Sequence, residues 1–95
     1  MNGEIARIKR KIAPILRRYG VTRAALFGSV ARGRSREGSD IDILVEVGPK
    51  ISLLGFVGLK QDLEDALGRP VDLVEYSTIK PLLRDRILAE QVVIA

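Results

Sequence analysis

The sequence has 95 residues and a net charge of +4, with neither cysteine nor histidine. The two absences exclude a disulfide framework, a thiolate or imidazole zinc site and a Ser-His-Asp hydrolase. Any chemistry must therefore come from carboxylates, hydroxyls, Lys and Arg. No segment approaches the ~20 apolar residues that span a bilayer, and the charged N-terminus is unlike a signal peptide. We therefore expect a single cytoplasmic domain over residues 1–95.

Charge is divided unevenly along the chain. Residues 1–36 contain ten Lys and Arg but only one acidic residue, Glu4, whereas residues 37–95 contain six basic and eleven acidic residues. A basic half beside an acidic half suits a phosphate-bearing ligand whose metal ion is held by carboxylates. Two oppositely charged solvated faces would explain the same pattern.

Hydrophobic periodicity and turn residues predict alternating helices and strands. In chain order these are helix 5–19, strand 23–27, short helix 29–33, polar loop 34–39, strand 41–47, helix 52–67, strand 71–74, a last helix and a terminal strand 92–94. Pro14 predicts that the first helix kinks or restarts near it. The alternation predicts an α+β (mixed α/β) fold, with a small central mixed β-sheet packed with helices.

Capping residues predict where the later helices begin and end. Ser52 is expected to cap the helix over residues 52–67, and Gly68 lies just past its end. Ser77 or Thr78 is expected to cap the last helix, with Pro81 in its first turn. That helix would present one apolar face, made of Ile79, Leu83 and Ile87.

A first candidate binding element is Gly28-Ser29, which follows a predicted strand and precedes a predicted short helix. The N-terminus of a helix offers free N–H groups and a partial positive charge, which suit phosphate. Gly28 lets the backbone approach a ligand closely, and the Ser29 hydroxyl adds a donor. Gly-Ser is also a common turn pair, so a simple turn is the alternative.

A second candidate is the pair Asp40 and Asp42. Side chains two residues apart on a strand share a face, so both carboxylates point the same way. Two such charges are held ionised most readily by a cation, and Mg²⁺ prefers oxygen ligands together with substrate phosphates. The alternative is an exposed strand edge on which Asp40 serves as a turn residue.

A third candidate is Asp72, which stands between apolar residues in the predicted strand 71–74. Aspartate is disfavoured at such a position. If the side chain lies beside Asp40 and Asp42, it completes a cluster of three carboxylates. The alternative is an aspartate that faces outward into solvent.

Three sequence blocks resemble the DNA polymerase beta-like nucleotidyltransferase superfamily. They are residues 27–33 (Phe-Gly-Ser-Val-Ala-Arg-Gly), 39–45 (Ser-Asp-Ile-Asp-Ile-Leu-Val) and 68–74 (Gly-Arg-Pro-Val-Asp-Leu-Val). Their order and spacing are similar to those of its smallest branch, the minimal nucleotidyltransferases of prokaryotes. The resemblance covers nearly the whole chain and implies the palm-like fold of that superfamily.

The resemblance also implies a role for each candidate residue in a magnesium-dependent transfer from ATP. Gly28 and Ser29 would contact the triphosphate, Asp40 and Asp42 would hold two Mg²⁺ ions, and Asp72 would share one ion and act as base. Such a two-metal site needs no histidine, because the metal ions stabilise the developing charge.

Three arginines lie close to these blocks. Arg32, three residues past Ser29, can reach a phosphate or pair with a neighbouring carboxylate. Arg34 and Arg36 are expected to be solvated.

The same resemblance implies a partner protein. Larger relatives add a domain that binds the acceptor, whereas minimal nucleotidyltransferases are typically encoded beside a helical HEPN toxin. They act as its antitoxin by binding it, by adding AMP to one of its tyrosines, or by both. Residues 53–59 are apolar on all sides of a predicted helix, which agrees with a hetero-oligomer or with burial in the core.

Two alternatives to the enzyme remain at this stage. One is a non-catalytic antitoxin that neutralises its partner by contact alone. The other is a nucleic-acid binder that uses the basic N-terminal half. The second is disfavoured because four aromatic residues, two Tyr and two Phe, leave few platforms on which bases could stack.

Overall fold

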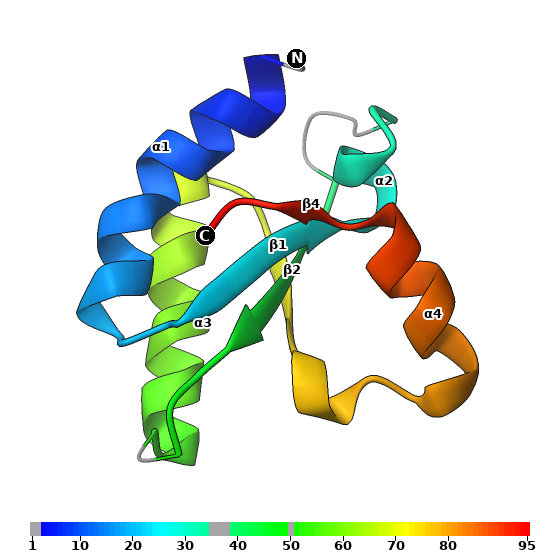
Figure 1. Cartoon of the computed structure of the whole chain (residues 1–95). Helices are drawn as coiled ribbons and strands as arrows, with labels where there is room; N and C mark the ends of the chain where they lie inside the picture. Colours follow the sequence, from blue (N-terminus) through cyan, green and yellow to red (C-terminus); the bar gives the residue numbers. More distant parts are fainter. Residues whose placement is uncertain (1–2, 35–38, 50) are drawn as a thin grey trace.

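The computed structural model describes residues 3–34, 39–49 and 51–95, in which helices and strands alternate along the chain (Figure 1). In chain order the elements are α1 (Gly3–Arg18), β1 (Arg23–Phe27), α2 (Gly28–Ala31), β2 (Ile41–Glu46), α3 (Leu53–Leu67), β3 (Val71–Glu75), the 3₁₀ helix η1 (Tyr76–Thr78), α4 (Pro81–Glu90) and β4 (Val92–Val93). No helix in the described ranges combines the length and apolar character needed to cross a membrane.

The four strands form one sheet in the order β3-β2-β1-β4. β1 is antiparallel to both of its neighbours, β2 and β4, whereas β2 and β3 run parallel. Parallel neighbours need a crossover connection, and α3 provides it between β2 and β3. The predicted mixed sheet of an α+β fold is therefore confirmed.

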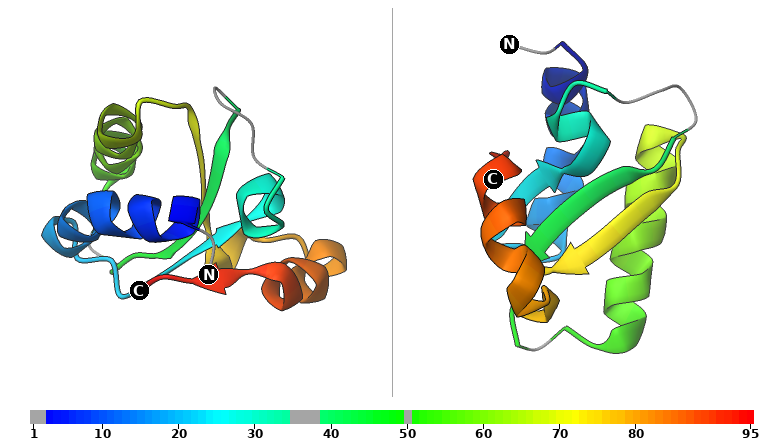
Figure 2. Two further views of the ribbon diagram at one scale, coloured as in Figure 1. Left: turned by 90° about the horizontal axis from the view of Figure 1, so that it is seen from above. Right: turned by 90° about the vertical axis from the view of Figure 1, so that its right-hand side faces the viewer.

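The two faces of the sheet are covered unequally. Figure 2 shows α1 and α3 on one side, and η1 and α4 on the other. The first side encloses the main core, which includes Ile8, Ile12, Leu16, Ala24, Leu26, Ile41, Ile43, Val45, Leu59, Leu63, Val71 and Leu73. The second side has a smaller buried cluster of Ala25, Leu44, Tyr76 and Ile79. Polar strand residues can therefore lie on the second face without being deeply buried.

Helix α1 runs on through Pro14 as one element, so the predicted restart there does not occur. Proline removes the hydrogen bond to the carbonyl of Arg10, four residues earlier. Pro14 and Arg10 are both exposed, so water can satisfy that carbonyl. The buried Ile12 and Ile15 on either side hold the helix against the core.

Helix α3 has the predicted ends. Ser52 is the N-cap residue, and its Oγ accepts a hydrogen bond of 3.0 Å from the backbone N–H of Gly55. Gly68 ends the helix with a left-handed φ of 65°. The apolar run 53–59 is divided between surface and interior, because Leu53 and Leu54 are 79% and 83% exposed whereas its last residue is buried.

The prediction for the last helix is wrong at its start. α4 begins at Pro81 with Lys80 as its N-cap, whereas Ser77 and Thr78 belong to η1. The hydroxyls of both donate hydrogen bonds to Glu75, the last residue of β3. Lys80, the residue before the proline, is held in an extended conformation. The helix therefore starts at the proline itself.

The predicted apolar face of α4 is only partly present. Ile79 is buried, but it lies before the helix, and Ile87 packs at the edge of the smaller cluster. Leu83 is 48% exposed and Leu82 is 97% exposed. α4 has no buried residue and packs against the edge of the smaller cluster.

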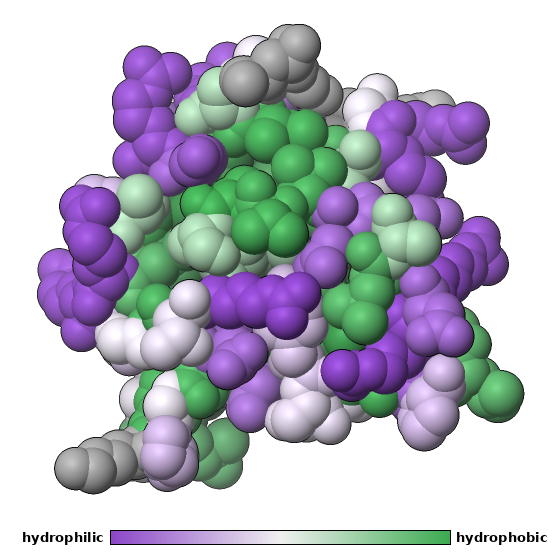
Figure 3. Space-filling view, in the orientation of Figure 1, coloured by the Kyte–Doolittle hydropathy of each residue, from purple (hydrophilic) through white to green (hydrophobic). Residues whose placement is uncertain are grey.

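An apolar groove of about 650 Å³ lies between α1 and the edge strand β4. Figure 3 shows apolar surface gathered there, with hydrophilic surface on the outer side of α1. The lining includes Ile5, Ala13, Val92 and Val93, together with the exposed Lys9, Arg10 and Arg17. The molecule therefore carries an open apolar surface with basic side chains at its border.

Candidate active site

Asp42 and Asp72 lie side by side on neighbouring strands. They are register partners in the parallel pairing of β2 with β3. The residues on either side of each aspartate are buried in the main core, so the alternation along a strand directs both carboxylates to the opposite, thinly covered face. The structure therefore brings together two aspartates that are 30 residues apart in the sequence.

The pKa of Asp42 is raised from its ordinary value of 3.8 to about 6. Partial burial of the carboxyl is the largest cause, and the negative charges of Asp72 and Asp40 add to it. A hydrogen bond from protonated Asp42 to Asp72 acts in the same direction, whereas the positive charge of Arg32 opposes it. Four of the predicted site residues are therefore close enough to interact electrostatically.

Gly28 begins α2 directly against this group. Its φ of 67° is left-handed, and a Cβ at this position would overlap Oδ2 of Asp42 and lie 3.0 Å from its Cγ. A side chain is therefore excluded twice, by the backbone conformation and by the approach of the aspartate. The sequence interpretation related Gly28 to a phosphate alone and did not foresee its contact with Asp42.

Ser29 and Asp40 lie on either side of this arrangement. Ser29 is half-buried in the first turn of α2, four residues long, and Asp40 is exposed. Asp40 immediately precedes β2, although the sequence predicted that it lies on the strand with Asp42. Its charge still acts on Asp42, so the departure from the strand does not remove it from the group.

Arg32 makes an ion pair that the sequence could not specify. Its Nη1 lies 3.1 Å from Oε2 of Glu90, at the end of α4. Of the two roles open to Arg32, pairing with a carboxylate is the one present in this structure. Arg34 is exposed, as expected, and Arg36 lies outside the described residues.

The donor set suits a hard divalent cation. Within residues 3–34, 39–49 and 51–95, no three acidic side chains are already arranged as a metal site. Magnesium, however, typically takes one or two carboxylates and completes its shell with water and substrate phosphates. Asp42 and Asp72 form such a pair. The raised pKa of Asp42 reflects its partial burial and then the negative charges of Asp72 and Asp40, which a cation would offset. The residues therefore fit Mg²⁺ with a phosphate ligand.

Comparison with known proteins agrees with this geometry. Residues 10–95 match the family described as polymerase beta nucleotidyltransferase. The chain belongs to this family of nucleotidyltransferases. The match includes Gly28, Asp42 and Asp72, and it supports the predicted enzyme class, transfer of a nucleotidyl group.

Two similar sequences are named as protein adenylyltransferases. A protein of Methanocaldococcus jannaschii, provisionally named a protein adenylyltransferase, is 58% identical over 88 residues, which cover 93% of this chain and 95% of that one. The protein adenylyltransferase MntA of Thermococcus cleftensis is 44% identical over 75 residues, which cover 79% of this chain and 76% of that one.

Solved structures share the fold. A provisionally assigned minimal nucleotidyltransferase superposes with a TM-score of 0.82 at 39% identity, covering 97% of this chain and 95% of the other. A toxin–antitoxin complex with AMP-PNP gives 0.79 at 28% identity, covering 92% and 72%. A tri-AMPylated HEPN toxin of Shewanella oneidensis in complex with its MNT antitoxin gives 0.73 at 25% identity, covering 95% and 71%. The predicted minimal nucleotidyltransferase fold is thus confirmed.

Proposed function

We propose that this nucleotidyltransferase moves AMP from ATP to a tyrosine hydroxyl of a helical HEPN-type toxin, in a magnesium-dependent reaction, and so acts as its antitoxin. One observation carries the proposal: Asp42, the register partner of Asp72 on the neighbouring strand, lies directly against Gly28 at the start of α2. The relatives named protein adenylyltransferases and the complex of an AMPylated toxin with an antitoxin support this choice of nucleotide and acceptor.

In this proposal the nucleotide binds between α2 and the start of β2. Gly28 and Ser29 contact the triphosphate at the beginning of α2, and Arg32 exchanges Glu90 for a phosphate oxygen. Asp40 and Asp42, together with Asp72, would hold two Mg²⁺ ions. When bound, these ions neutralise the phosphates and lower the pKa of the acceptor hydroxyl.

The transfer step balances with the groups named. The acceptor oxygen forms a bond to the α-phosphorus of ATP. The bond between that phosphorus and the oxygen that bridges it to the β-phosphorus breaks, and pyrophosphate leaves. Asp72 accepts the hydroxyl proton and returns it to solvent. A carboxylate is too weak a base for an unperturbed phenol, so this role depends on the lowered pKa of the acceptor.

The partner needs a surface on which to bind, and the chain offers apolar ones. Leu53 and Leu54 are exposed at the start of α3, Leu82 is exposed on α4, and the groove between α1 and β4 is open. A domain with this much accessible apolar surface is suited to form a complex. These surfaces support a hetero-oligomer.

The test is incubation of the chain with labelled ATP, Mg²⁺ and a HEPN toxin, followed by mass analysis of the toxin. Added AMP on a tyrosine, lost on chelation of the metal, is the expected result. Neutralisation of the toxin with no added mass would instead identify a contact-only antitoxin. Label on a residue other than tyrosine would contradict tyrosine as the acceptor, but the chain would still be a protein adenylyltransferase.

Asp72→Asn is expected to reduce the transfer rate by about 10²–10⁴-fold, the usual contribution of a general base. ATP affinity should change little, because Asp40 and Asp42 still carry charge toward the metal. Transfer rate and ATP binding are measured on the same preparation, with the exposed Asp65→Asn on α3 as the matched control. Near-normal turnover would exclude Asp72 as the base.

Glu90→Gln is expected to tighten ATP binding by about 1.4- to fivefold, because an exposed ion pair typically contributes about 0.2–1 kcal/mol that the phosphate must otherwise displace. Arg86→Gln is the matched control, since it removes the other ion pair of Glu90, at 3.7 Å, and leaves Arg32 in place. ATP titration in Mg²⁺ measures both variants. Unchanged or weaker binding in Glu90→Gln would show that Arg32 does not transfer to a phosphate.

A further inference from the structure

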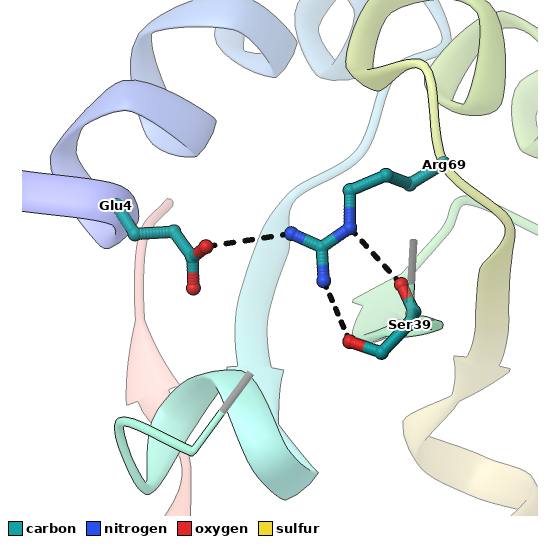
Figure 4. Close-up of polar contacts among 3 residues, drawn as sticks. All are labelled: Glu4, Ser39 and Arg69. Carbon is teal, nitrogen blue, oxygen red and sulfur yellow. Dashed lines mark hydrogen bonds and ion pairs between the residues drawn. The ribbon is translucent and has the colours of Figure 1, made fainter. Parts of the chain in front are cut away.

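Arg69 connects segments that are distant in the sequence (Figure 4). Its side chain is only 15% exposed. Its Nε donates a 3.0 Å hydrogen bond to the backbone carbonyl of Ser39, and its Nη2 donates a 2.8 Å bond to the Ser39 hydroxyl. Its Nη1 lies 3.4 Å from Oε2 of Glu4 in the first turn of α1. The guanidinium thus donates hydrogen bonds to both the main chain and the side chain of Ser39.

Asp40 follows Ser39 in the chain. On its other side, the backbone N–H of Ile41 donates a 2.9 Å hydrogen bond to the carbonyl of Pro70. Both neighbours of Asp40 are therefore bonded to consecutive residues of the turn that leads into β3. Asp40 is exposed and lies outside β2, so the strand ladder does not hold it, and these two attachments do.

The turn that leads into β3 is also bonded to α3. The backbone N–H of Val71 donates a 2.9 Å hydrogen bond to Oε2 of Glu64 on α3. Asp72 follows Val71 directly. The short segment 69–72 therefore contains Asp72 and also bonds to both neighbours of Asp40. A shift of this turn would move Asp40 and Asp72 together relative to the rest of the sheet.

We propose that Arg69 is a positioning residue for nucleotidyl transfer: it holds the main chain at Ser39, so that the carboxylate of Asp40 stays beside Asp42 and Asp72. This inference rests on the proposed function, in which Asp40 helps to hold the metal-bound nucleotide. Arginine suits the role because its planar fork makes parallel bonds in fixed directions, whereas lysine offers a single charged point. Arg69 itself does not contact the reacting atoms.

The experiment uses the full chain and measures three quantities: Mn²⁺ binding, the Mg²⁺ concentration for half-maximal transfer, and the melting temperature. Mn²⁺ accepts the same oxygen ligands as Mg²⁺ and serves as the binding probe. Arg69→Lys is expected to weaken Mn²⁺ binding by about 10–100-fold, as is typical when a residue that orients a metal ligand is changed. Half-maximal transfer should move to higher Mg²⁺ by a similar factor, with the rate at saturating Mg²⁺ close to wild type.

Glu4→Gln is the matched control, because it removes one ion pair of Arg69 and leaves the bonds to Ser39. It should bind Mn²⁺ like the wild type, although its melting temperature falls. A folded Arg69→Lys variant that binds Mn²⁺ normally would overturn the proposal. If Arg69→Lys does not fold, Arg69→Gln decides by the same measurement, because its shorter, uncharged side chain cannot make both bonds to Ser39. Weakened Mn²⁺ binding in that variant supports the proposal, and unchanged binding overturns it.

Asp42→Asn separates this inference from the proposed function. Normal Mn²⁺ binding in Asp42→Asn would remove the proposed metal site, and the role of Arg69 with it. Loss of binding in Asp42→Asn beside normal binding in Arg69→Lys would keep the metal site and overturn only the role of Arg69.

Discussion

Asp42→Asn is expected to make the metal-free protein more stable at pH 7 while it abolishes transfer. The folded state raises the pKa of this carboxyl from 3.8 to about 6, through burial and the charges of Asp72 and Asp40. The folded state therefore binds the proton more tightly than the unfolded state does. The contribution of this carboxyl to the free energy of unfolding is therefore highest below pH 4, declines as the pH rises from about 4 to about 6, and then levels off.

Asparagine removes that decline, because it carries no charge at any pH. Solvent reaches this partly exposed carboxyl and screens its neighbours, so the expected gain in the free energy of unfolding is about 1 kcal/mol at pH 7. The gain should disappear below pH 4. Urea unfolding of both proteins in a chelator, at pH 3.5 and pH 7, measures it, with Asp65→Asn as the matched control.

The same substitution should lower the transfer rate by at least about 10²–10³-fold, because metal-assisted charge stabilisation is worth several kcal/mol and about 1.4 kcal/mol corresponds to tenfold. Mg²⁺ with ATP should raise the melting temperature of the wild type and not that of the variant. A variant that is less stable than the wild type at pH 7, or that transfers AMP at close to the wild-type rate, would contradict the account of Asp42 as a charge held for a metal.

Gly28→Ala is expected to cause the largest loss of stability among the single changes considered. A left-handed φ costs a non-glycine residue about 1–2 kcal/mol, and overlap in a packed region adds about 1–3 kcal/mol. The added methyl would overlap Asp42, so the carboxylate must move and transfer should be lost as well. For a domain of this size, each kcal/mol lowers the melting temperature by about 4–8 °C.

Gly20→Ala separates the cost of the left-handed backbone from the cost of the overlap with Asp42. Gly20 has a φ of 73°, but a Cβ there would meet nothing within 4 Å. Gly20→Ala should therefore lose only the stability that the left-handed backbone conformation costs. In an Asp42→Ala background most of the excess loss at Gly28 should vanish, because Oδ2 and Cγ of the aspartate are gone. Equal losses for Gly20→Ala and Gly28→Ala would show that Asp42 does not crowd this glycine.

Local chemistry in the sequence determined most of the elements. Hydrophobic periodicity and turn residues located the α-helices and the strands, although not η1. Ser52 and Gly68 marked the ends of α3, because capping depends only on residues a few positions apart. The alternation of core and polar residues in β2 and β3 also determined that Asp42 and Asp72 cannot point into the main core. Where a nearby competitor intervened, as with Glu75 and Pro81 at the start of α4, the local prediction was wrong.

The tertiary structure decided which of these groups meet. The parallel pairing of β2 with β3 places Asp42 opposite Asp72, and no local pattern specifies that register. The contacts of Arg32 with Glu90 and of Arg69 with Ser39 join residues 58 and 30 positions apart. The approach of Asp42 to Gly28 likewise depends on how β1 and β2 align. Periodicity reports which face a side chain takes, whereas its neighbours across the fold depend on how the whole chain packs.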